Sequence, residues 1–161
     1  MKRRIFVLFL ILATVFLGSC SREARLEHCE LGILLPDEFR EYDPQGAYDA
    51  AYACDNTIVG MTRISFEAAA LDGVASTLEV SKFASIYKTG YGHEGRVRYY
   101  GDVPYYSYTV DTDTASLTYY HTFFKTPYAY YIITFITPTK GGVSSTNLLN
   151  LTKNVYLIQD K

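Results

Sequence analysis

Apolar and polar residues alternate along much of this chain in a way that predicts a protein rich in β-structure. Short runs of Val, Ile, Tyr, Phe and Thr, bounded by Gly, Pro, Asp or Asn, are typical of strands. The predicted strands cover residues 30–35, 48–54, 57–66, 103–111, 116–125 and 128–137. Asp55-Asn56 separates two of these runs and predicts a tight turn between them. Tyr130-Tyr131-Ile132-Ile133 is apolar at every position, which predicts a strand covered on both faces.

Two further segments carry the spacing of helices. Ser76 and Glu79 have the spacing of a capping box, and Gly90 predicts the end of the helix that follows. One apolar stripe lies between them, at helical spacing, on Val80, Phe83, Ala84 and Tyr87. Ser144 or Ser145 predicts the start of a last helix. The order of these elements predicts the α+β class, with a central antiparallel sheet of about six strands and helices packed on it.

The N-terminal segment has the pattern of an export signal. Lys2-Arg3-Arg4 is followed by the apolar run 5–17, which is too short to cross a bilayer as a helix. Leu17-Gly18-Ser19-Cys20 then resembles the lipobox of bacterial lipoproteins. The resemblance implies cleavage before Cys20 and a diacylglyceryl group on its thiol. Two acyl chains anchor a protein stably to a membrane.

This signal divides the chain into three predicted parts. Residues 1–19 are the signal peptide, 20–28 the lipidated N-terminus and a charged tether, and 29–161 one α+β domain. The residue after the lipidated cysteine is Ser21, not the aspartate that resembles an inner-membrane retention signal. We therefore expect an outward-facing protein on the bacterial membrane, and on the outer membrane where the cell has two.

The pattern of the domain resembles the PsbP-like superfamily, which includes DcrB-like envelope proteins and many bacterial lipoproteins. The similarity rests on the opening segment 31–39, the helix after Ser76, the aromatic hairpins and the closing segment 148–152. It implies a central antiparallel sheet between helices, as in a PsbP-like sandwich. Members of the superfamily share no single activity, so the resemblance implies no site residue.

Charge excludes one class of partner. Of 15 basic residues, three lie in the signal, which leaves 12 against 17 acidic residues. A protein with this balance is not suited to binding nucleic acid through phosphates.

Two cysteines remain once Cys20 is lipidated. If the strands 30–35 and 48–54 pair antiparallel, Cys29 and Cys54 lie opposite each other at the open end of the pair. We therefore hypothesise a Cys29–Cys54 disulfide, which would stabilise the domain by about 3.5 kcal/mol. The alternative is two free thiols.

The motifs of catalysis and of cofactor binding have the wrong context here. Gly90 to Gly95 matches G-x-G-x-x-G, but a helix precedes it and a strand follows, the reverse of a dinucleotide site. The three histidines have no spacing typical of metal ligands. The acidic turn from Asp37 to Asp43 is interpreted as a solvated face. The sequence predicts no enzyme, no metal and no cofactor.

Tyrosine is the most unusual feature, with 16 residues in the chain. Most of these rings are expected to fill the core. The others can form an aromatic face that binds a partner, since tyrosine and arginine are enriched at binding sites. The candidate binding residues are Tyr99, Tyr105, Tyr106, Tyr108, Arg96 and Arg98. The first hypothesis is a non-catalytic module that binds an envelope protein. The alternative is a module that binds a small ligand or a cell-wall glycan.

Overall fold

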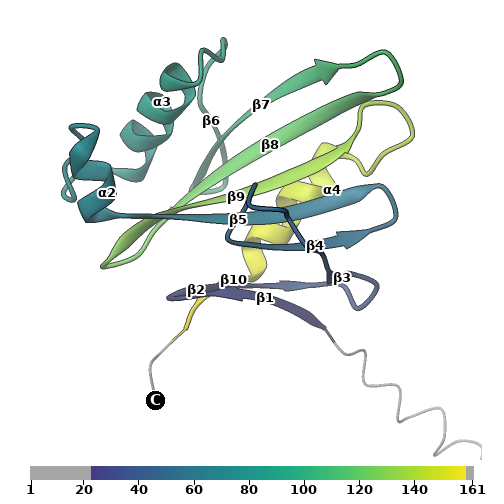
Figure 1. Ribbon diagram of the computed structural model, residues 1–161, viewed down its shortest axis with the longest axis horizontal. Helices are drawn as coiled ribbons and strands as arrows, with labels where there is room; N and C mark the ends of the chain where they lie inside the picture. Colours follow the sequence, from purple (N-terminus) through teal and green to yellow (C-terminus); the bar gives the residue numbers. More distant parts are fainter. Residues whose placement is uncertain (1–22, 159–161) are drawn as a thin grey trace, which may run out of the picture.

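The protein, described by a computed structural model over residues 23–158, contains two antiparallel sheets and a few short helices (Figure 1). The larger sheet has seven strands and the smaller has three. This mixed composition confirms the predicted α+β class. The predicted central antiparallel sheet of about six strands is present with seven strands, and the second, separate sheet of three strands was not predicted. Helices cover less of the sheet than the predicted sandwich implies.

The smaller sheet brings the two ends of the described chain together. Its order is β1-β2-β10, with β1 at Ala24–His28, β2 at Leu31–Leu35 and β10 at Val155–Leu157. Leu26 is buried while its neighbours Arg25 and Glu27 are exposed, the alternation of a half-buried strand. The predicted tether over 20–28 was therefore wrong for residues 24–28, which form β1.

The larger sheet has the order β3-β4-β5-β9-β8-β7-β6. Its strands are β3 (Arg40–Glu41), β4 (Ala50–Cys54), β5 (Thr57–Ser65), β6 (Arg98–Tyr100), β7 (Val103–Asp111), β8 (Ser116–Lys125) and β9 (Ala129–Pro138). The predicted turn at Asp55-Asn56 is confirmed, since Cys54 pairs with Thr57 across it. β9 is buried along nearly its whole length, which confirms the prediction that this strand is covered on both faces.

Each face of the larger sheet carries its own core. On one face, side chains from β5 and β9 pack with the smaller sheet and Leu148, in a core that includes Val59, Met61, Ile133 and Phe135. On the other face, Phe83 and Ala84 pack with Phe123, Tyr130 and Ile132. The molecule therefore has layers, with the smaller sheet on one side of the larger sheet and α2 and α3 on the opposite side (Figure 1).

The helices are α2 (Phe66–Leu71), α3 (Val80–Gly90) and α4 (Ser145–Asn150), and α4 continues into the 3-10 turn η1 (Leu151–Asn154). Ser144 caps α4, and its hydroxyl accepts a hydrogen bond from the Asn147 amide, as the sequence predicted. α3 ends at Gly90 as predicted, but Glu79 is its N-cap and provides no side-chain hydrogen bond, so the predicted capping box is not formed. None of the helices within residues 23–158 is long and apolar enough to cross a membrane.

Candidate functional site

The six candidate binding residues do not share one surface. Cross-strand partners lie on the same face of a sheet, and Arg98 pairs with Tyr105 whereas Tyr99 pairs with Pro104. Arg98 and Tyr105 therefore lie on the face of the smaller sheet and α4. Tyr99 lies on the opposite face, with α3, and the residue is 59% exposed. The predicted aromatic binding face is thus split between two sides of the sheet.

Tyr106 and Tyr108 belong to an aromatic–histidine cluster, which comprises Tyr87, Tyr91, His93, Tyr106, Tyr108, Tyr119 and His121. The His93 ring stacks on Tyr108 with 3.8 Å between centroids, and Tyr119 stacks on the same ring at 5.1 Å. Tyr106 is fully buried beside Phe123. Tyr106 is therefore a core residue, and the prediction that it is exposed for binding was wrong.

His121 lies in the middle of this cluster and is 7% exposed. Its Nδ1 is 2.8 Å from Oγ1 of Thr134, and its Nε2 is 3.4 Å from the Tyr108 hydroxyl. Burial, with a smaller contribution from His93, lowers the pKa of His121 to about 4. The ring is thus neutral at physiological pH and acts as a hydrogen-bonding member of the core.

The α3–β6 groove is a hollow of about 440 Å³ between α3 and the segment that leads into β6. It is lined by Ser81, Lys82, Ser85, Lys88, Gly95, Arg96, Val97 and Tyr99. Ser81, Ser85 and Lys88 have the i, i+4, i+7 spacing that places them on one side of a helix. Two of the predicted binding residues, Arg96 and Tyr99, therefore meet here.

Positive charge in this groove is not neutralised by the protein. Three cations line it, and no carboxylate does. Between residues 23 and 158 the structure contains an ion pair of Arg63 with Glu30 and a 3.9 Å contact between His28 and Asp49, and neither involves the groove. The Lys88 ammonium donates a hydrogen bond to the His93 carbonyl at 2.8 Å, which holds that cation in place.

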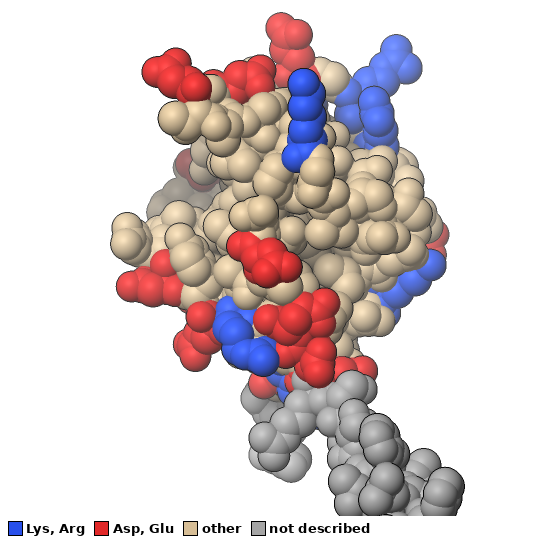
Figure 2. Space-filling view, turned by 90° about the vertical axis from the view of Figure 1, so that its right-hand side faces the viewer, with Lys and Arg blue, Asp and Glu red and all other residues tan. Residues whose placement is uncertain are grey.

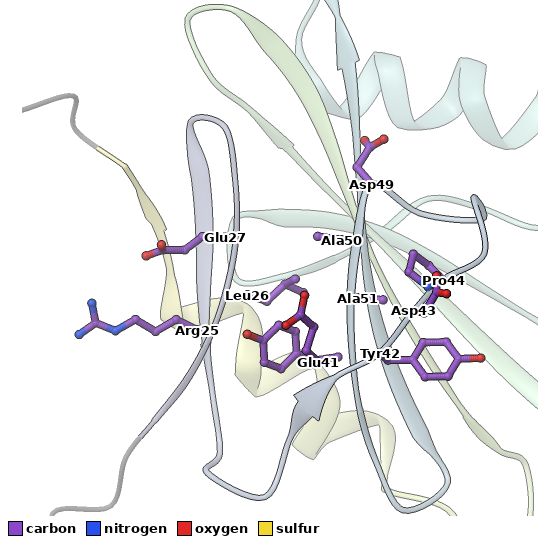
Figure 3. A pocket seen from close by; sticks show the side chains of 11 residues that line it. Arg25, Leu26, Glu27, Glu41, Tyr42, Asp43, Pro44, Asp49, Ala50 and Ala51 are labelled. Carbon is purple, nitrogen blue, oxygen red and sulfur yellow. The ribbon is translucent and has the colours of Figure 1, made fainter.

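A second hollow, of about 560 Å³, lies between β1 and the β3–β4 edge of the larger sheet (Figure 3). Leu26 points toward this hollow, while Arg25 and Glu27 point to the other side of the smaller sheet. Glu41, Asp43 and Asp49 border it and give it an acidic character.

Two of the carboxylates that border this second hollow accept hydrogen bonds from the backbone. Asp49 accepts a hydrogen bond from the Arg63 amide at 2.6 Å, and Asp43 accepts one from the Gln45 amide at 2.9 Å. No group of three or more His, Cys, Asp and Glu side chains within the described part of the chain is arranged to hold a metal ion. Figure 2 shows mostly acidic side chains along the lower part of the face that it views. The acidic turn is consistent with its interpretation as a solvated surface.

The two cysteines Cys29 and Cys54 are free. The register behind the predicted disulfide was wrong, because β2 pairs with β1 and β10 while β4 pairs with β3 and β5. Glu30, beside Cys29, contacts Arg63, whereas Cys54 lies opposite Thr57. The cysteines therefore lie near opposite ends of β5, whose span from Thr57 to Arg63 is roughly 20 Å, far beyond the reach of a disulfide.

Comparison with known proteins defines the fold and leaves the function open. No protein-family model matches the chain, and no curated protein matches it significantly. A crystal structure from Bacteroides thetaiotaomicron VPI-5482 at 1.50 Å resolution is similar, with a TM-score of 0.58 and 11% sequence identity. The match covers 86% of this chain and 50% of that one, so this chain spans about half of its length. At this identity the likeness shows a shared α+β fold.

Sequence reasoning missed the lysines of the groove. The sequence assigns no binding role to Lys82 or Lys88, and they meet Arg96 only because the chain turns back after α3. One signal was present, since the segment 81–98 contains four basic residues and one acidic residue in an acidic protein. The predicted lipidation site, Cys20, lies outside the described residues.

Proposed function

We propose that this protein is a non-catalytic binding module of the bacterial cell envelope, anchored by a diacylglyceryl group on Cys20. It faces outward, from the outer membrane where the cell has two. The support for the anchor is the lipobox pattern of residues 17–20.

The observation that carries the binding role is the position of the α3–β6 groove relative to the anchor. β1 begins at Ala24, four residues after Cys20, and four residues span at most about 14 Å. The smaller sheet is thereby held close to the membrane. The layer of α2 and α3 lies across the larger sheet from it (Figure 1). In this arrangement the groove points away from the membrane, toward other components of the envelope.

The environment of the histidine cluster supports a binding role over a catalytic one. General acid–base catalysis needs a group whose pKa lies near the working pH and that can reach substrate. The pKa of His121 is lowered to about 4, and both of its ring nitrogens already face side-chain oxygens.

We further propose that the domain is a divergent PsbP-like or DcrB-like domain. Two observations support this relationship. The opening segment forms β2, whose Leu31, Ile33 and Leu35 are core residues, and the closing segment forms the end of α4, where Leu148 and Leu149 are buried. Two of the four features that carried the resemblance, the opening and closing segments, therefore pack against the central sheet.

Two kinds of ligand remain for this module. An envelope protein could dock on the outer side of α3, where Ile86 and Tyr91 are exposed. A small ligand or glycan is favoured by the groove itself, because ligand pockets are concave and have volumes of several hundred Å³.

The anchor is tested by the variant Cys20→Ala in the native cell. We expect the precursor to keep its signal and the mature, lipidated form to disappear. Wild-type size together with membrane association in this variant would contradict the proposal.

The binding face is tested by placing a photo-cross-linking residue at Ile86 on α3 or at Leu157 on β10. These positions have similar exposure, 47% and 55%, and lie in opposite layers. We expect a stoichiometric envelope component to be captured from position 86 and not from position 157. Equal capture from both positions would argue against α3 as the binding face.

A further inference from the structure

The α3–β6 groove concentrates positive charge in a protein that is acidic overall. Lys82 and Lys88 approach it from α3, and Arg96 approaches it from the loop before β6. A cleft lined by one sign of charge focuses the electrostatic potential and attracts counter-ions. Since no carboxylate lines the groove, its cations are available to an anionic ligand.

The side chains that line the groove include donors that can bind an anionic group. The hydrogen bond from Lys88 to the His93 carbonyl uses one of three ammonium protons and leaves the others available. Gly95 has a φ of 90°, a conformation that favours glycine, and it turns the chain so that Arg96 lines the groove. Arginine binds a carboxylate or phosphate through two parallel hydrogen bonds.

Tyr99 gives the groove a flat apolar wall beside these cations. Its ring is largely exposed, whereas Tyr106 and Tyr108 of the neighbouring strand are packed into the cluster. An exposed ring beside charged donors suits a ligand with an apolar face and an acidic substituent, such as a sugar ring that carries an acid group. A simple inorganic anion would leave the ring unused.

We propose that the α3–β6 groove binds an acidic saccharide, with its carboxylate or phosphate on Lys82, Lys88 and Arg96 and its sugar ring against Tyr99. This inference rests on the proposed binding function and names its ligand class. Uronic acids and sugar phosphates present the same chemistry to the groove, and the experiment separates them.

The test uses the full lipidated protein in phosphatidylcholine vesicles, which carry no net charge. Glucuronate, glucose 6-phosphate, glucose and inorganic phosphate are titrated by calorimetry. We expect saturable binding of at least one acidic sugar, about tenfold tighter than that of glucose or of phosphate alone. Binding of glucuronate alone identifies a uronic acid, and binding of glucose 6-phosphate alone identifies a sugar phosphate. Failure of both acidic sugars to saturate would overturn the inference.

Arg96→Gln is the main variant, and Arg98→Gln is its matched control. Both arginines are exposed and two residues apart, but Arg98 lies on the opposite face of the sheet. We expect Arg96→Gln to weaken binding by about tenfold and Arg98→Gln by less than about twofold. Equal losses would mean non-specific attraction to charge and would overturn the inference. Tyr99→Ala is expected to weaken the binding of acidic sugars and to leave the binding of inorganic phosphate unchanged. Equal thermal midpoints show that the variants are folded.

A short poly-glutamate peptide distinguishes this inference from the proposed function. Tighter binding of the peptide than of either acidic sugar would overturn the saccharide assignment and leave the module as a protein-binding one. Cross-linking of an envelope component at position 86, together with no binding of either acidic sugar, would also leave the module as a protein-binding one. If neither cross-linking at position 86 nor sugar binding is observed, the proposed binding function is overturned as well.

Discussion

Arg63 on β5 forms a two-point ion pair with Glu30, the residue that follows Cys29 in the turn between β1 and β2. Its Nη2 lies 2.9 Å from Oε1 and its Nε lies 3.0 Å from Oε2. The buried Tyr131 hydroxyl donates to the same carboxylate. This contact joins the smaller sheet to the larger one, and Arg63 lowers the pKa of Glu30 to about 2.

Glu30→Gln is expected to lower the free energy of unfolding at pH 7 by about 1–2 kcal/mol, since the pair retains a quarter of its side-chain area in solvent and is partly screened. The pKa of Glu30 is lowered on folding, so the ionised carboxylate stabilises the protein above its usual pKa of 4.5. That stability is lost as the pH falls toward about 2.

Urea unfolding of both proteins at several pH values checks this prediction. The difference between wild type and Glu30→Gln should shrink between pH 4.5 and the lowest pH at which the protein folds. The exposed Glu94 serves as the control, and Glu94→Gln should unfold like wild type throughout. A difference that does not depend on pH would contradict the prediction.

Two buried tyrosines are expected to respond oppositely to the loss of a hydroxyl. The Tyr131 hydroxyl donates to the Glu30 carboxylate and accepts a hydrogen bond from the Glu30 amide at 3.1 Å. The Tyr106 hydroxyl is buried without a hydrogen-bond partner among the described residues. Tyr131→Phe should therefore destabilise the protein by about 1–3 kcal/mol, and Tyr106→Phe should be neutral or stabilising by up to about 1 kcal/mol. Thermal unfolding of the pair measures this contrast, and equal losses would refute it.

Because His121 is buried as a neutral ring, we expect the protein to lose stability in mild acid. Its pKa falls from the usual 6.5 to about 4 on folding, so the unfolded chain takes up a proton first as the pH is lowered. The contribution of neutral His121 to the free energy of unfolding is fully present above pH 6.5 and is lost as the pH falls toward 4. The loss amounts to at most about 3 kcal/mol. His121→Phe should show a shallower dependence over this range. Parallel curves for the two proteins would count against the assignment.

An aromatic ring packs directly on each of two glycines, Gly32 and Gly60. We expect the two positions to differ in how well they tolerate a substitution to alanine. A Cβ on Gly60 would lie 2.5 Å from Cγ of Tyr48, at the rigid base of the ring. A Cβ on Gly32 would meet Cζ and the hydroxyl of Tyr156, at the free end of that ring. We expect Gly60→Ala to lower the free energy of unfolding by about 1–3 kcal/mol and Gly32→Ala to lower it by less than about 1 kcal/mol. Chemical unfolding of both variants ranks them, and the reverse order would show that the rings move differently.

The cysteines are expected to react separately. Cys29 is exposed, while partial burial raises the pKa of the Cys54 thiol and reduces its reactive thiolate. In the folded protein without reductant, we expect both to be alkylated, Cys29 about tenfold faster. Mass spectrometry of the peptides gives both rates. A Cys29–Cys54 disulfide peptide would instead show that the two sheets pack differently.

Local sequence was enough to predict the longest strands. β7 and β8 have the predicted bounds, and α3 and α4 begin within a few residues of their predicted starts. These elements carry their own signals, because a period of two or of 3.6 fixes which side chains are buried. Of the strands that were missed, β3, β6 and β10 have two or three residues each, too few for a period to be recognised. β1 has five residues, but its charged positions resemble a tether.

Long-range pairing was decided by the tertiary structure alone. The sequence allowed β2 to pair with β4, which led to the predicted disulfide, yet β2 pairs with β1 and β10 at the two ends of the described chain. Nothing local separates these arrangements, since their difference lies in which apolar faces cover each other. The groove was hidden for the same reason, because Lys88 and Arg96 become neighbours only when α3 packs on the sheet. The sequence by itself determined the α+β class and the longest elements, each of which depends on neighbouring residues. Tertiary packing decided which tyrosines are core and which one, Tyr99, faces solvent beside three cations, because burial depends on the whole chain.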